Sequence, residues 1–112
     1  MRAGQLRQRL DLERRTRTPD GGGGFEEGWT VIEDGLSARV VQKTGSESVM
    51  GDTLSGIVTH TVYLRASSRT SGITNLHRLV DRRSGEIHDI KAVTHDERQR
   101  VMVLTTQTGG RD

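Results

Sequence analysis

Hydrophobic and polar residues alternate along the first segment of the chain. In residues 5–13 the even positions carry leucine, apart from Gln8, and the odd positions from Arg7 onward are charged. A period of two is typical of a half-buried β-strand. An amphipathic helix is the competing prediction, because Leu6 and Leu10 lie four positions apart and most residues here favour helices.

Later segments repeat the pattern of a strand. Residues 57–65 are rich in β-branched side chains, and residues 36–41 place Leu36, Ala38 and Val40 on one face. Residues 76–83 fit either a short strand or one helical turn. The strands predicted after the first are residues 25–33, 36–41, 57–65, 86–93 and 100–106.

Six to seven short strands separated by turns predict an all-β fold, which is a small antiparallel β-barrel or sandwich. Neighbouring residues of a strand point to opposite faces, so the alternation also predicts which side chains point inward. The predicted inner face comprises Leu10, Leu12, Val40, Val62, Ile90, Val93 and Leu104.

Four segments lack this pattern. Residues 16–24 carry the only proline and four consecutive glycines, which predict a mobile Gly-rich loop. Residues 42–56 are mostly small and polar, and a loop of this length within a compact domain is usually functional or disordered. Residues 107–112 are expected to form a flexible tail. The sequence THDERQ, residues 94–99, is expected to form a hairpin turn in which Asp96 accepts hydrogen bonds from backbone amides.

The composition limits the size of the core. The 112 residues fit a single domain, 1–112, in which 30% of residues are hydrophobic and 3% aromatic. A lone subunit would therefore be marginally stable, and we expect stabilisation by partner subunits. Cysteine is absent, which excludes disulfides and thiolate metal sites. No apolar stretch is long enough to predict a signal peptide or a membrane span.

The charge of the chain gives little sign of nucleic-acid binding. A net charge of +2 balances 17 basic against 15 acidic residues. All the basic residues except Lys43 and Lys91 are arginines, which pair well with carboxylates on a partner surface. Residues 81–83 form a small basic cluster with Arg78, but the aromatic residues are scattered along the chain, so we expect no specific nucleic-acid reader.

Side chains with metal-ligand atoms gather near the end of the chain. Their spacing matches no compact metal motif, and no nucleophile is placed beside a base, so we expect no bound metal, no cofactor and no enzymatic activity. The candidate ligands are His88, His95, Asp96 and Glu97, to which folding could add His60 and His77.

Several short motifs follow one another in a distinctive order. A Leu-Arg-x-Arg-Leu strand precedes a Gly-rich turn that leads to a tryptophan, an Ala-x-Val strand and a Gly-x-Glu sequence. A Thr-His strand that ends in arginine then precedes a Gly-x-x-His-x-Ile-x-x-Val segment and Asp-Glu-Arg. These residues are Leu6, Arg7, Arg9, Leu10, Leu12, Arg14, Gly22, Trp29, Ala38, Val40, Gly45, Glu47, Thr59, His60, Arg65, Gly85, His88, Ile90, Val93, Asp96, Glu97, Arg98 and Leu104. The ordered set resembles the phage head-tail joining family, also called head closure or stopper proteins, which includes neck proteins of gene transfer agents.

The resemblance implies a small β-barrel that assembles into a ring, with six copies in that family. The ring would lie in the virion neck between the portal-side adaptor ring and the tail-terminator or tail-tube ring. It would join the DNA-filled capsid to the tail and help to retain the DNA without sequence specificity. Assembly would take place in the bacterial cytoplasm, with no membrane partner. The alternative is a small OB-like β-barrel that binds nucleic acid or a protein partner.

Two segments are expected to make the contacts of such a ring. Arginines of the first strand are expected to pair with acids of a neighbouring subunit, and the loop of residues 42–56 is expected to close the channel or dock a neighbour. The interface candidates are Arg7, Arg9, Val49, Met50 and Leu54, and the loop is marked by Gly45, Glu47, Gly51, Asp52 and Gly56.

Overall fold

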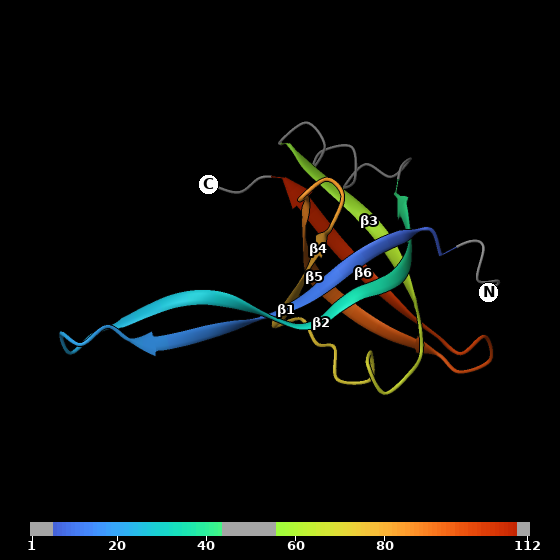
Figure 1. Cartoon of the computed structure of the whole chain (residues 1–112). Coiled ribbons are helices and arrows are strands. Elements are labelled where there is room, and N and C mark those ends of the chain that lie inside the picture. The colour runs from blue at the N-terminus through green and yellow to red at the C-terminus, as the bar shows by residue number, and fades with distance from the viewer. Residues whose placement is uncertain (1–5, 44–55, 110–112) are drawn as a thin grey trace.

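The computed structural model describes residues 6–43 and 56–109, and within these residues six antiparallel strands close into a barrel (Figure 1). The prediction of an all-β antiparallel fold is confirmed. Residues 8–13 belong to a strand rather than a helix, and residues 76–83 contain a strand. In the order β1-β2-β3-β6-β5-β4 around the barrel, the strands are β1 (Gln8–Pro19), β2 (Phe25–Gln42), β3 (Ile57–Arg65), β6 (Val101–Gly109), β5 (Ile87–Asp96) and β4 (His77–Asp81).

The core lies inside this ring of strands, and the predicted inner face is confirmed. Five of the seven predicted residues are buried, and Val40 and Val93 pack against the same cluster. Leu10 is fully buried where the barrel closes, because it pairs with Leu36 on β2 and with Asp81 on β4. The cluster also contains Leu36, Ala38, Leu64, Ile73, Leu79 and Met102.

Residues 25–33 and 36–41 belong to a single strand, β2, so the prediction of two separate strands here is wrong. The register between β1 and β2 shifts on either side of Leu12, as at a β-bulge, which bends a strand without ending it. Gly35 has φ of 62° nearby, a conformation that glycine adopts without strain. Its amide donates a hydrogen bond of 2.8 Å to Asp11 Oδ1. This bond gives the irregular backbone a partner, so the strand continues through it.

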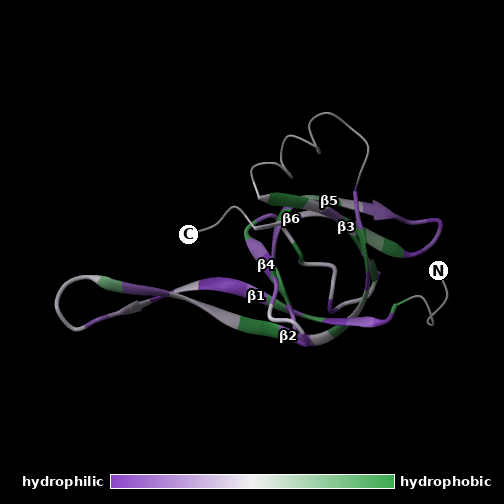
Figure 2. Cartoon of the chain, turned by 90° about the horizontal axis from the view of Figure 1, so that it is seen from above, coloured by the Kyte–Doolittle hydropathy of each residue, from purple (hydrophilic) through white to green (hydrophobic). Residues whose placement is uncertain are grey.

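The paired strands β1 and β2 extend beyond the barrel as a hairpin (Figure 1). In the described part of the chain, β1 pairs with β4 only as far as Arg14, and from Arg15 to Pro19 it pairs with β2 alone. We call residues 15–29 the arm. Figure 2 shows the arm extending to one side of the ring of strands.

The predicted loop of residues 16–24 is therefore wrong for residues 16–19, which belong to β1. Proline lacks an amide hydrogen, but Pro19 ends the strand, where that loss is tolerated. The turn of residues 20–24 has a defined conformation: Gly21 and Gly23 have positive φ, and Asp20 Oδ1 accepts hydrogen bonds from the amides of Gly22 and Gly24. The glycines are required by the turn geometry.

The predicted tail of residues 107–112 is also wrong in part, because β6 continues to Gly109. Its polar residues turn inward: Thr106 and Thr108 are buried and bond to histidines. A turn follows β5 as predicted, and Asp96 Oδ1 accepts a hydrogen bond from the Gln99 amide at 3.1 Å, but the predicted bounds 94–99 are wrong for residues 94–96, which belong to β5. Residues 110–112 lie outside the described part of the chain. Among residues 6–43 and 56–109, no helix is long and apolar enough to cross a membrane.

Candidate interaction surfaces and a buried histidine cluster

A groove of about 480 Å³ lies where the start of β1 meets the turn between β4 and β5. Four arginines line this arginine groove, and Asp81 is the acidic residue among its lining residues. Both predicted interface arginines, Arg7 and Arg9, belong to it. The complete lining is Arg7, Gln8, Arg9, Asp81, Arg82, Arg83 and Ser84. An excess of guanidinium groups favours an anionic partner.

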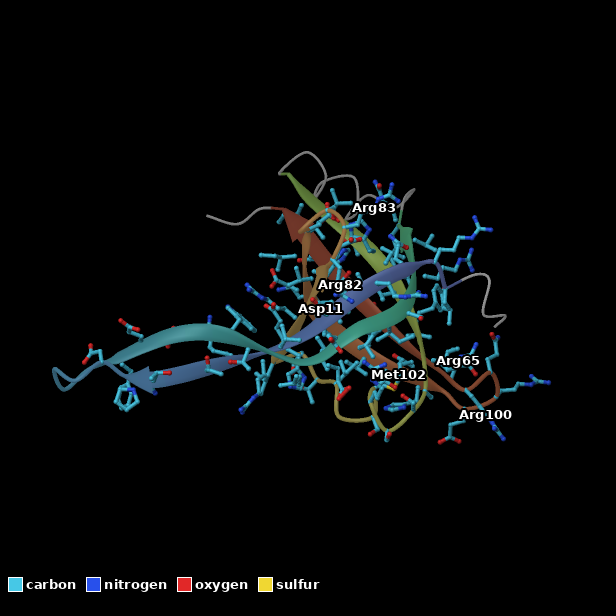
Figure 3. All side chains as sticks on the ribbon, in the orientation of Figure 1. Asp11, Arg65, Arg82, Arg83, Arg100 and Met102 are labelled. Atoms are coloured by element: carbon cyan, nitrogen blue, oxygen red, sulfur yellow. The ribbon has the colours of Figure 1, made fainter. Side chains whose placement is uncertain are left out.

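The turn between β4 and β5 positions the other two arginines of the groove. The Asp81 carboxylate accepts hydrogen bonds from the amides of Arg83 and Ser84, which fixes the turn. The Arg82 amide donates to the Arg9 carbonyl at 3.1 Å and so joins the turn to β1. Figure 3 shows Arg82 beside Asp11, whose Oδ1 lies 3.6 Å from Arg82 Nε. The Arg82 side chain is 54% exposed, so this surface ion pair is weak and leaves the guanidinium accessible to a partner.

The arm and its base carry exposed apolar side chains. Phe25 at the tip is 55% exposed, and Val31 and Ile32 at the base are also exposed. Figure 2 shows hydrophobic stretches in this part of β2. The Arg17 guanidinium lies 4.4 Å from the centre of the Phe25 ring, a cation–π contact that stabilises the ribbon without covering its apolar surface.

A nearly buried ion pair holds the base of the arm against the barrel. Arg78 Nε on β4 lies 2.7 Å from Glu13 Oε1 on β1. The Arg78 guanidinium also lies 4.2 Å from the centre of the Trp29 ring, and Arg15 approaches the same ring at 5.4 Å. Trp29 therefore does form a stacking surface for arginine, contrary to the prediction that no aromatic residue lies near Arg78.

Two histidines are buried side by side within the barrel. His60 on β3 and His88 on β5 have ring centres 4.9 Å apart, at an angle of 65°. On β6, between these strands, Thr108 Oγ1 lies 3.1 Å from His60 Nε2, and Thr106 Oγ1 lies 3.1 Å from His88 Nδ1. The threonine hydroxyls therefore fix the orientation of both rings.

The three groups with metal-ligand atoms that lie close together in the described residues are His60, Glu86 and His88. Their ligand atoms are all within 4.8 Å of one another. The sequence grouped His88 with residues of the following turn, but these residues are absent from this cluster. Glu86 was missed although it lies two positions before His88, whereas His60 joins the pair only through the pairing of β3 and β5 with β6.

The other candidate ligands lie elsewhere. His95 and Asp96 lie at the end of β5, and Glu97 follows in the turn to β6. His77 starts β4, where its Nδ1 accepts a hydrogen bond from the Thr74 amide at 3.0 Å. His88 lies near the start of β5, whereas His95 and Asp96 lie at its end, so the length of the strand separates these candidate ligands.

The ionisation of the buried histidines is shifted by their surroundings. Burial lowers the pKa of His88, and the neighbouring His60 lowers it further, while the carboxylates of Glu86, Asp81 and Asp89 oppose the shift. Burial also lowers the pKa of His60, against the opposing effect of Glu86. Both imidazoles are therefore neutral in the folded protein near neutral pH.

We expect the free energy of unfolding to decrease as the pH falls below about 6.5. The unfolded chain takes up protons on His60 and His88 near this pH, whereas the folded chain holds both rings neutral to lower pH. The unfolded state then binds more protons than the folded state, so protonation favours unfolding. The contribution of each neutral ring to stability is fully present above the pKa of the unfolded chain. It decreases at lower pH by up to about 1.4 kcal/mol per pH unit for each ring.

Urea unfolding between pH 5 and pH 8 in metal-free buffer measures this slope. The His88→Gln variant serves as the control, because its slope should be shallower by the contribution of one histidine. Equal slopes in the two proteins would contradict the assignment of the effect to this ring.

Several predicted contact residues lie outside the described part of the chain. These are Gly45, Glu47, Val49, Met50, Gly51, Asp52 and Leu54. Gly56, at the end of the predicted loop, is described: it is exposed, has φ of 84° and immediately precedes β3.

Comparisons with known proteins agree with this architecture. No curated protein matches the sequence. One similar solved structure is a chain described as "Virion of native gene transfer agent (GTA) particle", with a TM-score of 0.61 and 21% sequence identity. The match covers 93% of this chain and 94% of that chain, and at this identity it concerns the fold. The phage head completion protein family matches residues 1–109, which include all six strands and both surfaces described above. This match confirms the resemblance to phage neck proteins, and the chain belongs to the phage head completion protein family.

Proposed function

We propose that the protein is a structural component of a virion neck, in which identical subunits form a ring between the portal-side adaptor and the tail and help to retain packaged DNA. Family membership and the likeness to a chain of a virion particle support a virion role. The observation that carries the ring is the arm of residues 15–29, which extends from the barrel with apolar surface exposed. The proposed role is mechanical and requires no catalysis.

The arm has the properties of a segment that is covered in an assembly. A two-stranded ribbon is at best marginally stable in water, and this one has no third strand beyond Arg14 among the described residues. Its exposed Phe25 resembles the aromatic anchors that dominate many protein interfaces. We propose that a second copy of this chain covers the arm, because the chain itself carries a surface of complementary charge.

The complementary surfaces are the tip of the arm and the arginine groove. Near the tip, Glu26 and Glu27 are exposed, while Arg7, Arg9, Arg82 and Arg83 line the groove at the start of β1. Two different surfaces that recognise each other make a heterologous contact, which generates a ring when the rotation closes. The proposal is that the tip of each arm lies in the arginine groove of the next subunit.

The loop of residues 42–56 belongs to the same proposal. Its apolar residues, Val49, Met50 and Leu54, would contact the adjacent ring or close the channel. This part rests on the sequence and the family resemblance, because residues 44–55 lie outside the described part of the chain. A ring of six copies, by the same resemblance, completes the proposed neck.

Disulfide cross-linking tests the proposed contact, since the natural chain contains no cysteine and gives no background. Particles assembled from an Arg9→Cys, Glu27→Cys double variant should, after mild oxidation, give a ladder of multiples of the 12.4 kDa chain on a denaturing gel. Contact between the two positions places the cysteines within the short range that a disulfide spans. The largest band of the ladder would give the number of subunits in the ring.

Each single cysteine variant is the matched control and should give no product beyond a dimer. A charge exchange provides an independent check. The double variant Arg7→Glu, Arg9→Glu should reduce the yield of joined particles, and so should the double variant Glu26→Arg, Glu27→Arg. The variant with all four changes should restore the yield. If the double cysteine variant yields only monomer and the combined charge variant is not restored, the arm does not bind this groove.

A further inference from the structure

We propose that His60, Glu86 and His88 form a binding site for a divalent transition metal of the zinc class, inside one end of the barrel. None of the three ligands lines the arginine groove, although the Glu86 backbone bonds to Ser84 and Asp81 of its lining, and metal binding does not depend on the proposed ring. It replaces the expectation from the sequence that no metal is bound, which considered only ligands close together along the chain.

The spacing of the ligand atoms fits a tetrahedral metal ion. Ligands about 2.0–2.1 Å from zinc lie about 3.3 Å apart in a tetrahedral arrangement. His88 Nε2 and Glu86 Oε1 are already 3.4 Å apart. All three ligand atoms lie within 4.8 Å of one another, so movements of about 1 Å by side chains would complete the site.

The hydrogen bonds of the two rings leave the required nitrogens available. Thr108 occupies Nε2 of His60, so Nδ1 is the nitrogen left for a metal. His60 is only 9% exposed, and its Nδ1 is buried without a hydrogen-bond partner. Burial of an unpartnered polar atom is unfavourable, and a metal ion would give it a partner.

The second ring is oriented in the same way. His88 bonds through Nδ1 to Thr106, which directs Nε2 toward Glu86. Metal-binding histidines usually use the other ring nitrogen for a fixed hydrogen bond, which sets the tautomer and the ring orientation. The hydroxyls of Thr106 and Thr108 would provide this support from β6.

The type of metal follows from the ligands. Two imidazoles and one carboxylate suit zinc and the neighbouring transition metals, whereas calcium and magnesium prefer oxygen ligands. Imidazole binds a metal through an unprotonated ring nitrogen, and the buried Nδ1 of His60 has no hydrogen-bond partner that would compete for it. Glu86 is 51% exposed and opens the cluster to solvent, so a metal ion can enter. Three protein ligands leave one position for water or for a group from another molecule.

Metal binding would link parts of the barrel that are distant in the sequence. His60 is on β3, while Glu86 directly precedes β5 and His88 lies within it. Because β6 lies between β3 and β5, the metal would join them across the intervening strand. Any ligand that binds only the folded state stabilises it by mass action. The metal site would therefore strengthen a barrel whose core is poor in large side chains.

Zinc titration of the full chain, after removal of metal with a chelator, tests this site. We expect isothermal titration to show a single equivalent of bound zinc, and we expect the melting temperature to rise with the zinc concentration. Cobalt in place of zinc should give the visible absorption bands of a tetrahedral site. The Glu86→Gln variant removes the anionic ligand from an exposed position and should bind zinc at least about tenfold more weakly, by analogy with the loss of supporting groups around other metal sites.

The matched control is His95→Ala, which removes an exposed histidine of the same strand outside the cluster and should leave zinc affinity unchanged. His60→Gln provides a second test, since its amide can retain a bond to Thr108 but cannot replace Nδ1. The proposal is overturned if the natural chain binds no zinc, if Glu86→Gln binds it as tightly as the natural chain, or if affinity is lost in His95→Ala instead.

Discussion

A variant in which Asn-Gly replaces residues 16–28 will fold as the same barrel but will fail to assemble joined particles. The replacement retains the pair between Arg15 and Trp29 and closes it with a dipeptide that favours tight hairpins. The core cluster lies elsewhere, so the melting temperature should change by only a few degrees. Assembly should fail because the variant lacks Phe25, Glu26 and Glu27.

The expected loss is large because, in the proposed ring, the same change is repeated at every contact between subunits. An interface residue that dominates binding contributes about 2 kcal/mol or more, which corresponds to about a thirtyfold change in the affinity of one contact. A closed ring needs all its contacts, so the losses multiply. Counting joined, DNA-filled particles by electron microscopy measures the effect.

The control for the arm replacement changes an exposed apolar residue elsewhere. Val41, near the end of β2 and opposite Thr61 on the barrel, is 37% exposed, and Val41→Thr should leave particle numbers unchanged. A normal yield of joined particles from the variant without the arm would show that the arm takes no part in assembly.

The second large effect concerns stability: Leu10→Ala should lower the free energy of unfolding by about 2–5 kcal/mol. Leu10 is fully buried where β1 pairs with both β2 and β4, so the truncation leaves a cavity at the closure of the barrel. For a domain of this size the melting temperature should fall by about 10–20 °C. Thermal and urea unfolding of the purified chain provide the measurement.

The appropriate control is Val31→Ala, which truncates an exposed residue at the base of the arm. We expect its effect to stay within about 0.5 kcal/mol, as is usual for surface positions. A change below about 1 kcal/mol for Leu10→Ala would mean that the closure of the barrel relaxes around the smaller side chain.

The two groups of predictions separate stability from assembly. The core residues face the interior of the barrel, whereas the arm and the arginine groove present their side chains outside it. Arg78 connects the two regions, because it pairs with Glu13 on β1 and stacks against Trp29 in the arm. The direction of the arm is therefore set by the barrel, which would let each subunit present its tip at a fixed angle to a neighbour.

The sequence alone determined the class of the fold and most of the inner face. The alternation that placed Leu10, Leu12, Val62 and Leu104 inside is a local property, because successive residues of any strand point to opposite sides. The turn at Asp96 was also predictable, since a side chain that bonds nearby amides acts within a few residues. The order of motifs likewise indicated the family.

The tertiary structure decided where strands begin, end and meet. Composition alone favoured a loop at residues 16–19, but pairing with β2 gives these residues hydrogen-bond partners and makes them part of the arm. Similarly, the sequence predicted Thr108 in a flexible tail, whereas it lies in β6 and bonds to His60.

The candidate sites show the same division. The sequence singled out Arg7 and Arg9, but their joining with Arg82 and Arg83 depends on the antiparallel pairing of β1 with β4. The cluster of His60, Glu86 and His88 depends on two further pairings, of β3 and of β5 with β6. Side-chain alternation is determined within a few residues of the chain, whereas these contacts depend on the register between strands far apart in sequence, which is set only when the barrel closes.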